Sequence, residues 1–383
     1  MSPARIVVAG AGPVGLALAC ACAEMEVRVV DPAPAPLPPV DAFDARIFAL
    51  STGTRSLLRD VGAWDRLDPS RVTPVRRMDV FGDGGTKLSF SGRPGAALAW
   101  IVEAGRLSWA LEEQAASADG VAIQRGATVQ RFEPQAGGTR VVLEDGATLD
   151  ADLLVGADGP ESRIRTLLGV AVEKRSYAET AIVANFDTEK EHGHAARQWF
   201  RADGVLAWLP LPGRRISIVW SAPDAVAAEL AALEPAELAV RVRDAGGAAL
   251  GDLGILSKPV RFPLRLTVVD RTVAEGVALV GDAAHGVHPL AGQGVNLGFQ
   301  DARVLAHELA ERSPLERPGD LRVLRRYART RREDVTAMQF VTDGLDRLFA
   351  SGAPGASWLR NAGLGFVDGQ PWIKGALSDR AMR

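Results

Sequence analysis

The sequence predicts a mixed α/β fold: a Rossmann-like nucleotide-binding domain interleaved with an antiparallel-sheet domain and followed by a helical C-terminus. Three observations predict it. Residues 5–31 read as strand, glycine turn, helix and strand. Residues 170–270 alternate β-rich runs with turns, and the chain beyond residue 296 is helical in pattern almost to its end.

Length and composition set the outer bounds. The chain has 383 residues, 47% of them hydrophobic and 24% charged, which is ordinary for a globular protein of one large or two smaller domains. The net charge of -3 gives no overall positive field, so we expect no binding to nucleic acid. Cys20 and Cys22 are the only cysteines, and their spacing on a predicted helix excludes a disulfide framework.

The start of the chain and its apolar stretches indicate where the protein resides. The N-terminus (MSPARIVVAG) enters a strand rather than a signal peptide, and the longest apolar stretch, residues 14–23, is too short to cross a bilayer. We therefore expect a cytoplasmic protein. The sequence leaves open a peripheral contact with the inner membrane or with a multi-enzyme complex, and it leaves the oligomeric state open.

The first element is the strongest local signal. Gly10, Gly12 and Gly15 lie between the first strand and the first helix, and Asp31 ends the second strand. In this context the first glycine permits a tight turn, the second lets the main chain approach a pyrophosphate, and the third lets the helix pack closely on the strand. The helix N-terminus stabilises phosphate, and Asp31 suits a ribose hydroxyl. The pattern predicts a dinucleotide site.

The elements that follow are predicted from two patterns of apolar residues: the helical spacing of three or four residues and the alternation typical of strands. The proline-rich run PAPAPLPPV must be an extended loop. Helical spacing or β-pattern then predicts, in chain order, a helix over 45–64, strands with glycine turns over 72–100, a helix over 104–118, strands over 121–156, a helix over 161–168, and a helical interruption of the β-rich segment near 224–245.

Two further strand ends carry glycine and an acid. The run DLLVGADGPESRIR delivers Asp158 and Gly159 to a helix that carries Arg165, and strand 277–280 delivers Gly281 and Asp282 to a glycine-rich helix entrance. Such an entrance offers unpaired N–H groups and the positive end of a helix dipole. Taken alone, an Asp-Gly pair after a strand, as at Asp158 and Gly159, is more typical of an ordinary turn.

Together these three signatures resemble the single-component flavoprotein aromatic hydroxylases of the para-hydroxybenzoate hydroxylase fold. The run GDAAHGVHPLAGQGVNLG at 281–298 is most similar to ubiquinone-biosynthesis hydroxylases of the UbiH/UbiF type. The runs DARIFALS at 44–51, FPL at 262–264 and GLGFVDGQPWIKGAL near the C-terminus are also similar to that branch, so the resemblance covers nearly the whole chain.

The resemblance implies FAD as the cofactor and NADPH or NADH as the reductant. The sequence has one dinucleotide fingerprint and no separate nicotinamide-binding domain, so the reductant would bind transiently. It implies that Asp282 binds the ribityl chain. The other cofactor-binding residues it implies are Gly10, Gly12, Gly15, Asp31, Arg46, Arg106, Asp158, Gly159, Arg165, Gly281, Gly294, Val295 and Asn296. Where the branch carries asparagine beside the arginine, this chain has Ala104 and Gly105, which puts the contact at Arg106 in question.

The reaction implied is hydroxylation of an aromatic ring by O₂ through a C4a-hydroperoxyflavin, with a lipophilic polyprenylated phenol of ubiquinone biosynthesis as substrate. Pro289, His288 and Gly292 would lie along the isoalloxazine as the catalytic positions. The cofactor carries the oxygen chemistry, and the protein orients the reactants and excludes water. Residues 1–70, 98–170 and 275–335 would form the FAD-binding domain, 71–97 and 171–274 the substrate domain, and 336–383 a C-terminal helical segment.

Several residues have alternative interpretations. His285 and His288 lack further ligands at metal spacing, so we expect no metal site. His192 and His194 are expected on a solvated surface loop. Arg46 and Arg106 could be ordinary surface arginines. The tryptophans of the β-rich segment could line an aromatic pocket or fill the core, and these are Trp199, Trp208 and Trp220.

The function also has alternatives. A flavin monooxygenase for a soluble aromatic compound or polyketide would share every cofactor motif. A flavin-dependent reductase of isoprenoid double bonds would work without O₂. A non-catalytic FAD-bound scaffold within a biosynthetic complex would keep the same glycines.

Overall fold

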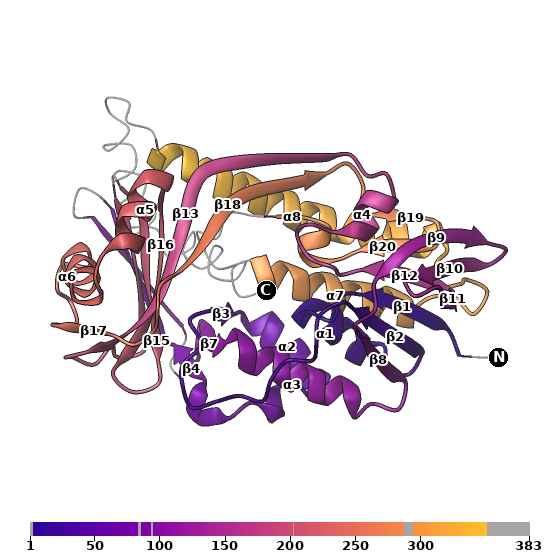
Figure 1. The fold of residues 1–383 in the computed structure, drawn as a ribbon, viewed down its shortest axis with the longest axis horizontal. Coiled ribbons are helices and arrows are strands. Elements are labelled where there is room, and N and C mark those ends of the chain that lie inside the picture. The colour runs from indigo at the N-terminus through magenta and orange to yellow at the C-terminus, as the bar shows by residue number, and fades with distance from the viewer. Residues whose placement is uncertain (1–2, 83–85, 93–94, 202, 287–293, 351–383) are drawn as a thin grey trace.

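The computed structural model describes residues 3–82, 86–92, 95–201, 203–286 and 294–350, with side chains described as far as residue 340. Two β-rich bodies are joined by a pair of long strands, β13 (Val172–Thr188) and β18 (Val260–Val269), which run from one body to the other across the top of Figure 1. The predicted mixed α/β class is confirmed.

The first body is built on a six-stranded sheet. Its order is β19-β20-β12-β1-β2-β8, and all neighbours are parallel except the edge strand β19. The strands are β1 (Arg5–Ala9), β2 (Glu26–Asp31), β8 (Val121–Arg125), β12 (Leu153–Gly156), β19 (Val273–Ala274) and β20 (Val277–Leu279). Because β1, β12 and β20 are parallel neighbours, their carboxyl ends meet at one edge of the sheet, which brings the three glycine-containing turns together.

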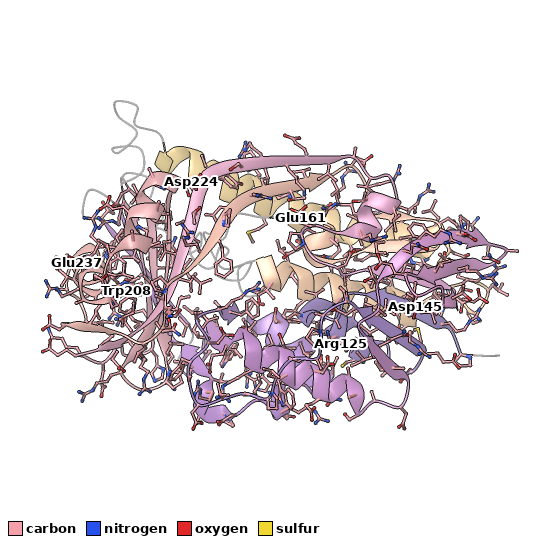
Figure 2. All side chains as sticks on the ribbon, in the orientation of Figure 1. Arg125, Asp145, Glu161, Trp208, Asp224 and Glu237 are labelled. Carbon is pink, nitrogen blue, oxygen red and sulfur yellow. The ribbon has the colours of Figure 1, made fainter. Side chains whose placement is uncertain are left out.

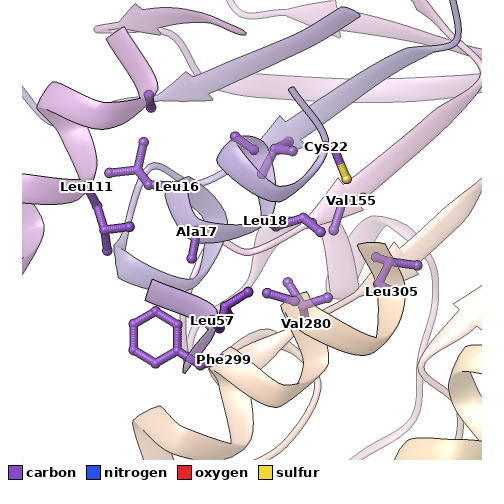
Figure 3. Packing of buried hydrophobic residues seen from close by; sticks show 14 of the residues in the cluster. Leu16, Ala17, Leu18, Cys22, Leu57, Leu111, Val155, Val280, Phe299 and Leu305 are labelled. Atoms are coloured by element: carbon purple, nitrogen blue, oxygen red, sulfur yellow. The ribbon is translucent and has the colours of Figure 1, made fainter. Parts of the chain in front are cut away.

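Alternation along β1 explains why this sheet is covered on both faces. Ile6 and Val8 point into the core formed with the helices, while Val7 and Ala9 point to the opposite face, toward a three-stranded meander. The helical layer is visible in Figure 3 around Leu16, Leu18, Phe299 and Leu305. The covering elements are α1 (Pro13–Ala21), α3 (Ala104–Ala116), α7 (Gly294–Ala310), α8 (Leu321–Ala350), α4 (Arg163–Leu167), β9 (Val129–Gln135), β10 (Gly138–Leu143) and β11 (Thr148–Ala151).

The two cysteines belong to this helical layer. Cys22 is buried in the core, and burial raises the pKa of both thiols to about 12, which keeps them protonated at neutral pH. Cys22 therefore packs as a small apolar side chain.

The second body is an eight-stranded sheet of order β17-β13-β16-β15-β14-β5-β6, with β18 also paired to β13. Its strands are antiparallel except where β14 pairs with β5. That parallel pair joins chain segments more than 100 residues apart. Its remaining elements are β5 (Arg77–Phe81), β6 (Lys87–Ser91), β14 (Ala195–Arg201), β15 (Gly204–Leu211), β16 (Arg215–Pro223), β17 (Leu253–Ile255) and the covering helices α5 (Asp224–Ala232) and α6 (Pro235–Ala245). The predicted helical interruption near 224–245 is these two helices.

The tryptophans lie on the outer face of this sheet, under α5 and α6. Trp208 and Trp220 are fully buried in that core, and Trp199 packs edge-on against Trp208 with 4.8 Å between ring centroids. Figure 2 labels Trp208 in this sheet, far from Glu161 in the other body. The core interpretation of these residues is therefore correct, and the aromatic-pocket alternative is wrong.

Two local predictions fail because long-range contacts override local pattern. Residues 47–50 are not helical: they form β3 (Ile47–Leu50), which pairs with β7 (Ala99–Glu103) beside β4 (Thr73–Val75). Ser51 then caps α2 (Thr52–Asp60) by accepting from the Thr54 amide, and short 3-10 turns follow at Trp64–Arg66 and Pro69–Arg71.

His192 is the second failure. The sequence predicts an exposed histidine, but its side chain is buried and its Nε2 lies 2.9 Å from the Leu211 carbonyl oxygen. A buried ring with a main-chain partner stabilises the loop before β14 rather than facing water.

Candidate active site

The glycines of the first turn divide into two kinds. Gly10 has φ of +112°, and a Cβ there would lie 2.3 Å from the Ala157 carbonyl oxygen, while a Cβ at Gly15 would lie 2.0 Å from the Gly10 carbonyl oxygen. Both glycines are required by close main-chain packing. Gly12 differs, because a Cβ there would have no heavy atom within 4 Å. Space beside Gly12 is open, and it belongs to a cavity.

Asp31 lies at the end of β2 and accepts hydrogen bonds from the main chain. Its carboxylate accepts from the Ala11 amide at 2.6 Å and the Ala33 amide at 2.7 Å. Arg125, from the end of β8, lies 3.4 Å from Asp31 and also contacts Glu112. Sequence reasoning missed Arg125, because its role depends on β8 pairing with β2. A small cavity of about 160 Å³ adjoins this corner, beside Gly10, Pro32 and Thr128.

Asp158 and Arg165 organise the second turn. The Asp158 carboxylate accepts from the Ser162 hydroxyl at 2.5 Å and from the amides of Arg163 and Ile164, so it fixes the start of α4. Arg165 is buried, and its guanidinium donates to main-chain carbonyls of Pro160 on its own turn and of Asp282 and Ala283 on the third. Arg165 therefore holds the second and third turns together.

The third turn presents Asp282 to the cavity. Gly281 has φ of +60°, which turns the chain at the end of β20. Protein surrounds the Asp282 carboxyl, yet its side chain is open to the cavity. Burial raises the pKa of Asp282, although nearby His285 and Arg46 lower it. A carboxylate held open in this way can accept hydrogen bonds from a bound polyol.

A buried cluster of charged groups lies directly behind the Gly281 turn. Asp301 of α7 accepts from the Gly281 amide at 2.8 Å, lies 2.7 Å from His285 Nε2, and pairs at 2.7 Å with Arg331 of α8. Burial opposes ionisation of Asp301, but His285 and Arg331 outweigh it and lower its pKa. We call Asp301, His285 and Arg331 the buried triad. Asp301 and Arg331 are partners that sequence reasoning missed, since nothing local marks a contact between residues 30 apart.

Arg46 and Arg106 have different surroundings. Arg46 is exposed to the cavity, with its guanidinium 5.3 Å from the Phe48 ring centroid and 5.9 Å from that of Phe262. Arg106 donates to Glu103 at 2.9 Å and to the Val40 carbonyl at 2.7 Å, and Arg71 binds the same glutamate. Arg106 thus anchors the proline-rich loop to the start of α3.

Other predicted site residues fall at the start of α7. Gly294 and Val295 line the cavity, whereas the Asn296 amide turns to the Ser51 amide, the Thr54 hydroxyl and the Ala49 carbonyl. Asn296 therefore ties α7 to β3 and α2. The three predicted catalytic positions, His288, Pro289 and Gly292, lie outside the described residues. In the described part of the chain, no group of three or more His, Cys, Asp or Glu side chains could hold a metal ion.

The cavity has a volume of about 660 Å³ and two unlike walls. One wall is formed by the turns, with Gly12, Pro13, Gly159, Gly281, Asp282 and Gly294. The other is formed by the inner face of the eight-stranded sheet, with Ala181, Val183, Leu209, Val219, Phe262 and Leu264. At its rim, Glu161 contacts Lys174 at 2.5 Å and Arg265 at 3.4 Å, a charged group that sequence reasoning also missed.

The first wall fits the diphosphate and polyol of FAD. Gly12 is the N-cap residue of α1, and it has no side chain to occupy the free amides of the first turn of the helix. Those amides and the positive end of the helix dipole face the open space beside Gly12, which suits an anionic diphosphate. Asp282 offers a carboxylate for hydroxyl groups at the other end of the same wall.

Comparisons with known proteins agree with this geometry. The FAD binding domain family matches residues 4–341. The ubiquinone hydroxylase UbiL of Rhodospirillum rubrum is 32% identical over 345 residues, which cover 89% of this chain and 80% of that protein. The 3-demethoxyubiquinol 3-hydroxylase of Escherichia coli is 32% identical over 331 residues, covering 84% of this chain and 83% of that protein.

Solved structures share the fold over almost the whole chain. A mutant of PqsL from P. aeruginosa superposes with a TM-score of 0.79 at 25% identity, covering 95% of this chain and 99% of that chain. Klebsiella pneumoniae HpxO complexed with FAD and uric acid superposes with a TM-score of 0.76 at 20% identity, covering 99% of this chain and 97% of that chain, a likeness of fold alone.

The glycine turns, the open start of α1 and the facing apolar sheet define an FAD-dependent flavoprotein monooxygenase. More particularly, the chain belongs to the FAD binding domain family and, within it, to the flavoprotein ubiquinone hydroxylases. The family resemblance predicted from the three signatures is confirmed.

Proposed function

We propose that this protein uses NAD(P)H and O₂ to hydroxylate the aromatic ring of a polyprenylated phenol in ubiquinone biosynthesis, with FAD as its cofactor. The observation that carries the proposal is the cavity of about 660 Å³ in which an FAD-type wall faces an apolar wall. Identity of 32% to ubiquinone hydroxylases over about four fifths of their length supports the substrate class.

The residues assigned to the cofactor follow from their positions. The amides at the start of α1, beside Gly12, would hold the diphosphate, Asp31 would bind the adenosine ribose, and Asp282 would bind the ribityl chain. Asp158, Gly159 and Arg165 act through the second turn: Arg165 holds it against the third. FAD, when bound, supplies the redox and oxygen-transfer chemistry.

The start of α7 completes the cofactor assignment. Gly294, Val295 and Asn296 would carry main-chain amides along the isoalloxazine, where donors stabilise negative charge. Pro289, His288 and Gly292 keep their assignment as the catalytic positions of the preceding segment. We assign Arg46 to the cofactor side of the cavity, and Arg106 to the entrance formed by the proline-rich loop.

The apolar wall would hold the phenol. Val183, Leu209 and Val219 point from the sheet into the cavity and bind a ring or prenyl group without competing for hydrogen bonds. The same side chains exclude water from the reacting atoms, so activated oxygen is not lost to reaction with water before it reaches the phenol. Arg46, above Phe48 and Phe262, places a fixed positive charge where a phenolate oxygen would be stabilised.

The proposed division of the chain separates the eight-stranded sheet from most of the six-stranded sheet. We assign residues 1–70, 98–170 and 275–335 to the FAD-binding domain, 71–97 and 171–274 to the substrate domain, and 336–383 to a C-terminal helical segment. A lipophilic substrate also implies a peripheral contact with the inner membrane or with a complex on its cytoplasmic side. No helix in the described part of the chain is long and apolar enough to span a membrane.

The experiment is a substrate panel with purified yellow protein. Lipophilic phenols with short prenyl chains should accelerate NAD(P)H oxidation and give a product with one added oxygen atom from ¹⁸O₂, whereas water-soluble aromatic acids should not. Acceleration by a soluble aromatic compound alone would assign the protein to the soluble-substrate class. Product without O₂ would favour a reductase, and flavin never reduced by NAD(P)H would favour a scaffold.

A further inference from the structure

Helix α8 presents two different faces. Val323, Leu324, Tyr327 and Arg331 are buried against the rest of the first body. Arg322, Arg325, Arg329 and Arg332 are exposed. At about 100° per residue, these four arginines fall within an arc of roughly 80° on the helix surface, so they form one continuous row. We call this row the arginine stripe.

In the described part of the chain, Glu316 interacts electrostatically with Arg322 at one end of the stripe, but no acid forms a close pair with the stripe. Among the described residues, no hydrogen bond or ion pair involves the guanidinium of Arg322, Arg325, Arg329 or Arg332. Arg326 and Arg331 on the same helix differ, because they pair with Glu308 and Glu316 and with Asp301 and Asp334. Glu333 is exposed but falls about 20° outside the arc. No acid among the described side chains of α8 lies within the arc, so the stripe keeps a net positive charge on a chain whose formal net charge is -3.

An exposed aromatic ring continues the row. Phe340 is 79% exposed, and it lies 18 residues, or about five full helical turns, beyond Arg322. Its side chain therefore leaves the helix in the same direction as that of Arg322. A row of unpaired guanidinium groups ending in an exposed phenylalanine combines the two interactions that hold a helix at a membrane surface: phosphate binding and insertion of an apolar group.

We propose that the arginine stripe and Phe340 form a docking surface for anionic lipid headgroups. The proposal rests on the proposed function, because a polyprenylated phenol partitions into the bilayer and the enzyme must meet it there. Arginine suits this role, since its planar fork binds phosphate oxygens in pairs. An acidic protein would satisfy the guanidinium groups equally well, but the lipophilic substrate of the proposed function resides in a bilayer, so the lipid surface is the occupant we assign.

The test is co-sedimentation of the full-length, FAD-loaded protein with vesicles. One set is pure phosphatidylcholine, and the other contains about 30% phosphatidylglycerol. We expect binding to the anionic vesicles alone, weakened at about 0.5 M salt because the Debye length then falls to a few ångströms. The triple variant Arg325→Gln, Arg329→Gln, Arg332→Gln should lower the partition coefficient on the order of 100-fold, at about fivefold per arginine.

The matched control removes the same charge from other faces. Arg28, Arg59 and Arg241 are exposed, lie on β2, α2 and α6, and form no ion pair with an acid in the described part of the chain, so their replacement by glutamine should leave vesicle binding unchanged. Phe340→Ser should weaken vesicle binding more at high salt than at low salt. Salt screens the attraction between the arginines and the lipid but not the insertion of the phenylalanine ring, which this variant removes. Equal loss in both triple variants would reduce the effect to net charge and overturn the assignment.

The outcomes separate docking from catalysis. All variants should keep their flavin and their oxidation of NAD(P)H with a water-dispersible short-chain phenol, because the stripe lies outside the cavity. Hydroxylation without vesicle binding by the wild-type protein would reject the lipid surface, leaving an acidic protein as the partner, and would keep the proposed function. If vesicle binding depends on the stripe but the protein hydroxylates no phenol, the lipid docking surface is kept and the proposed function is rejected.

Discussion

One wall of the cavity is made of main chain at the ends of β1, β12 and β20, whereas the opposite wall is made of apolar side chains from β13, β15, β16 and β18. On the first wall, tight packing fixes the residue type: no side chain fits at Gly10 or Gly15. On the second, Ala181, Val183 and Val219 need only be apolar and of suitable size. The cofactor wall should therefore tolerate few substitutions, and the sheet wall should change its selectivity with little loss of folding.

The largest effect separates two glycines of one turn. Gly15→Ala should abolish soluble protein, because its Cβ would lie 2.0 Å from the Gly10 carbonyl oxygen, and that main chain cannot move away. Gly12→Ala should fold normally, since its Cβ meets no atom and its φ of -76° suits any residue. Its affinity for FAD should fall on the order of 100-fold, because the methyl group fills the space the diphosphate needs. Expression yield and flavin titration of apoprotein measure the two effects.

Removing the open carboxylate should cost nearly as much flavin. Asp282→Ala should be isolated colourless or weakly yellow, because the ribityl hydroxyls lose their acceptor. Asp145→Ala, on an exposed turn of the β9–β11 meander labelled in Figure 2, is the control and should keep full flavin. Full occupancy in Asp282→Ala would falsify the ribityl assignment.

Disrupting the buried triad, which supports the Gly281 turn of the cofactor wall, should have an intermediate effect. Asp301→Asn removes the buried counter-charge of Arg331 and leaves it only the partly exposed Asp334, which costs up to about 3–5 kcal/mol of stability, and it loosens the Gly281 turn. We expect a lower melting temperature, roughly tenfold weaker FAD binding and a shifted flavin absorption band. Arg326→Gln also removes a contact between α7 and α8, but far from the turn. It should lower stability slightly and leave the flavin spectrum unchanged; a spectrum equally changed in both variants would show a merely structural role.

A bulky residue on the sheet wall tests the other half of the comparison. Val219→Trp should raise the KM for a prenylated phenol about tenfold while flavin content stays full, because the added ring occupies substrate space. Val240→Trp makes the same change on the exposed surface of α6 and should have no effect. Steady-state kinetics over the substrate range decides it, and loss of flavin in Val219→Trp would contradict the assignment of the two walls.

The smallest effect concerns pH. Burial raises the folded-state pKa of Asp282 in the apoprotein, so its contribution to stability is present below the ordinary carboxyl pKa near 4 and is lost as pH rises through the raised value. Asp282→Asn removes this penalty. Its melting temperature should match that of the wild-type apoprotein at low pH and exceed it by roughly 1–2 °C at neutral pH. A difference of the opposite sign would show that Asp282 is stabilised as a carboxylate before FAD binds.

The cofactor wall could be predicted from the sequence because its requirements are local. Gly10, Gly12 and Gly15 are spaced by the geometry of a single strand-to-helix turn, and Asp282 directly follows a buried strand. The predicted helix over 45–64 was wrong at β3, because pairing of residues 47–50 with β7 depends on a strand 50 residues away. Arg125, Asp301 and Arg331 were missed for the same reason: each acquires its role from a long-range contact.

Arg331 and Arg332 are adjacent residues of one helix, and their side chains leave it about 100° apart, one buried and one exposed. Arg331 reaches Asp301 behind the Gly281 turn, whereas Arg332 faces solvent on the arginine stripe. A lipid surface that binds the arginine stripe therefore contacts a residue directly next to one that supports the Gly281 turn. We expect the fluorescence intensity of bound flavin to change when anionic vesicles are added. Flavin fluorescence would then report contact between the protein and a bilayer.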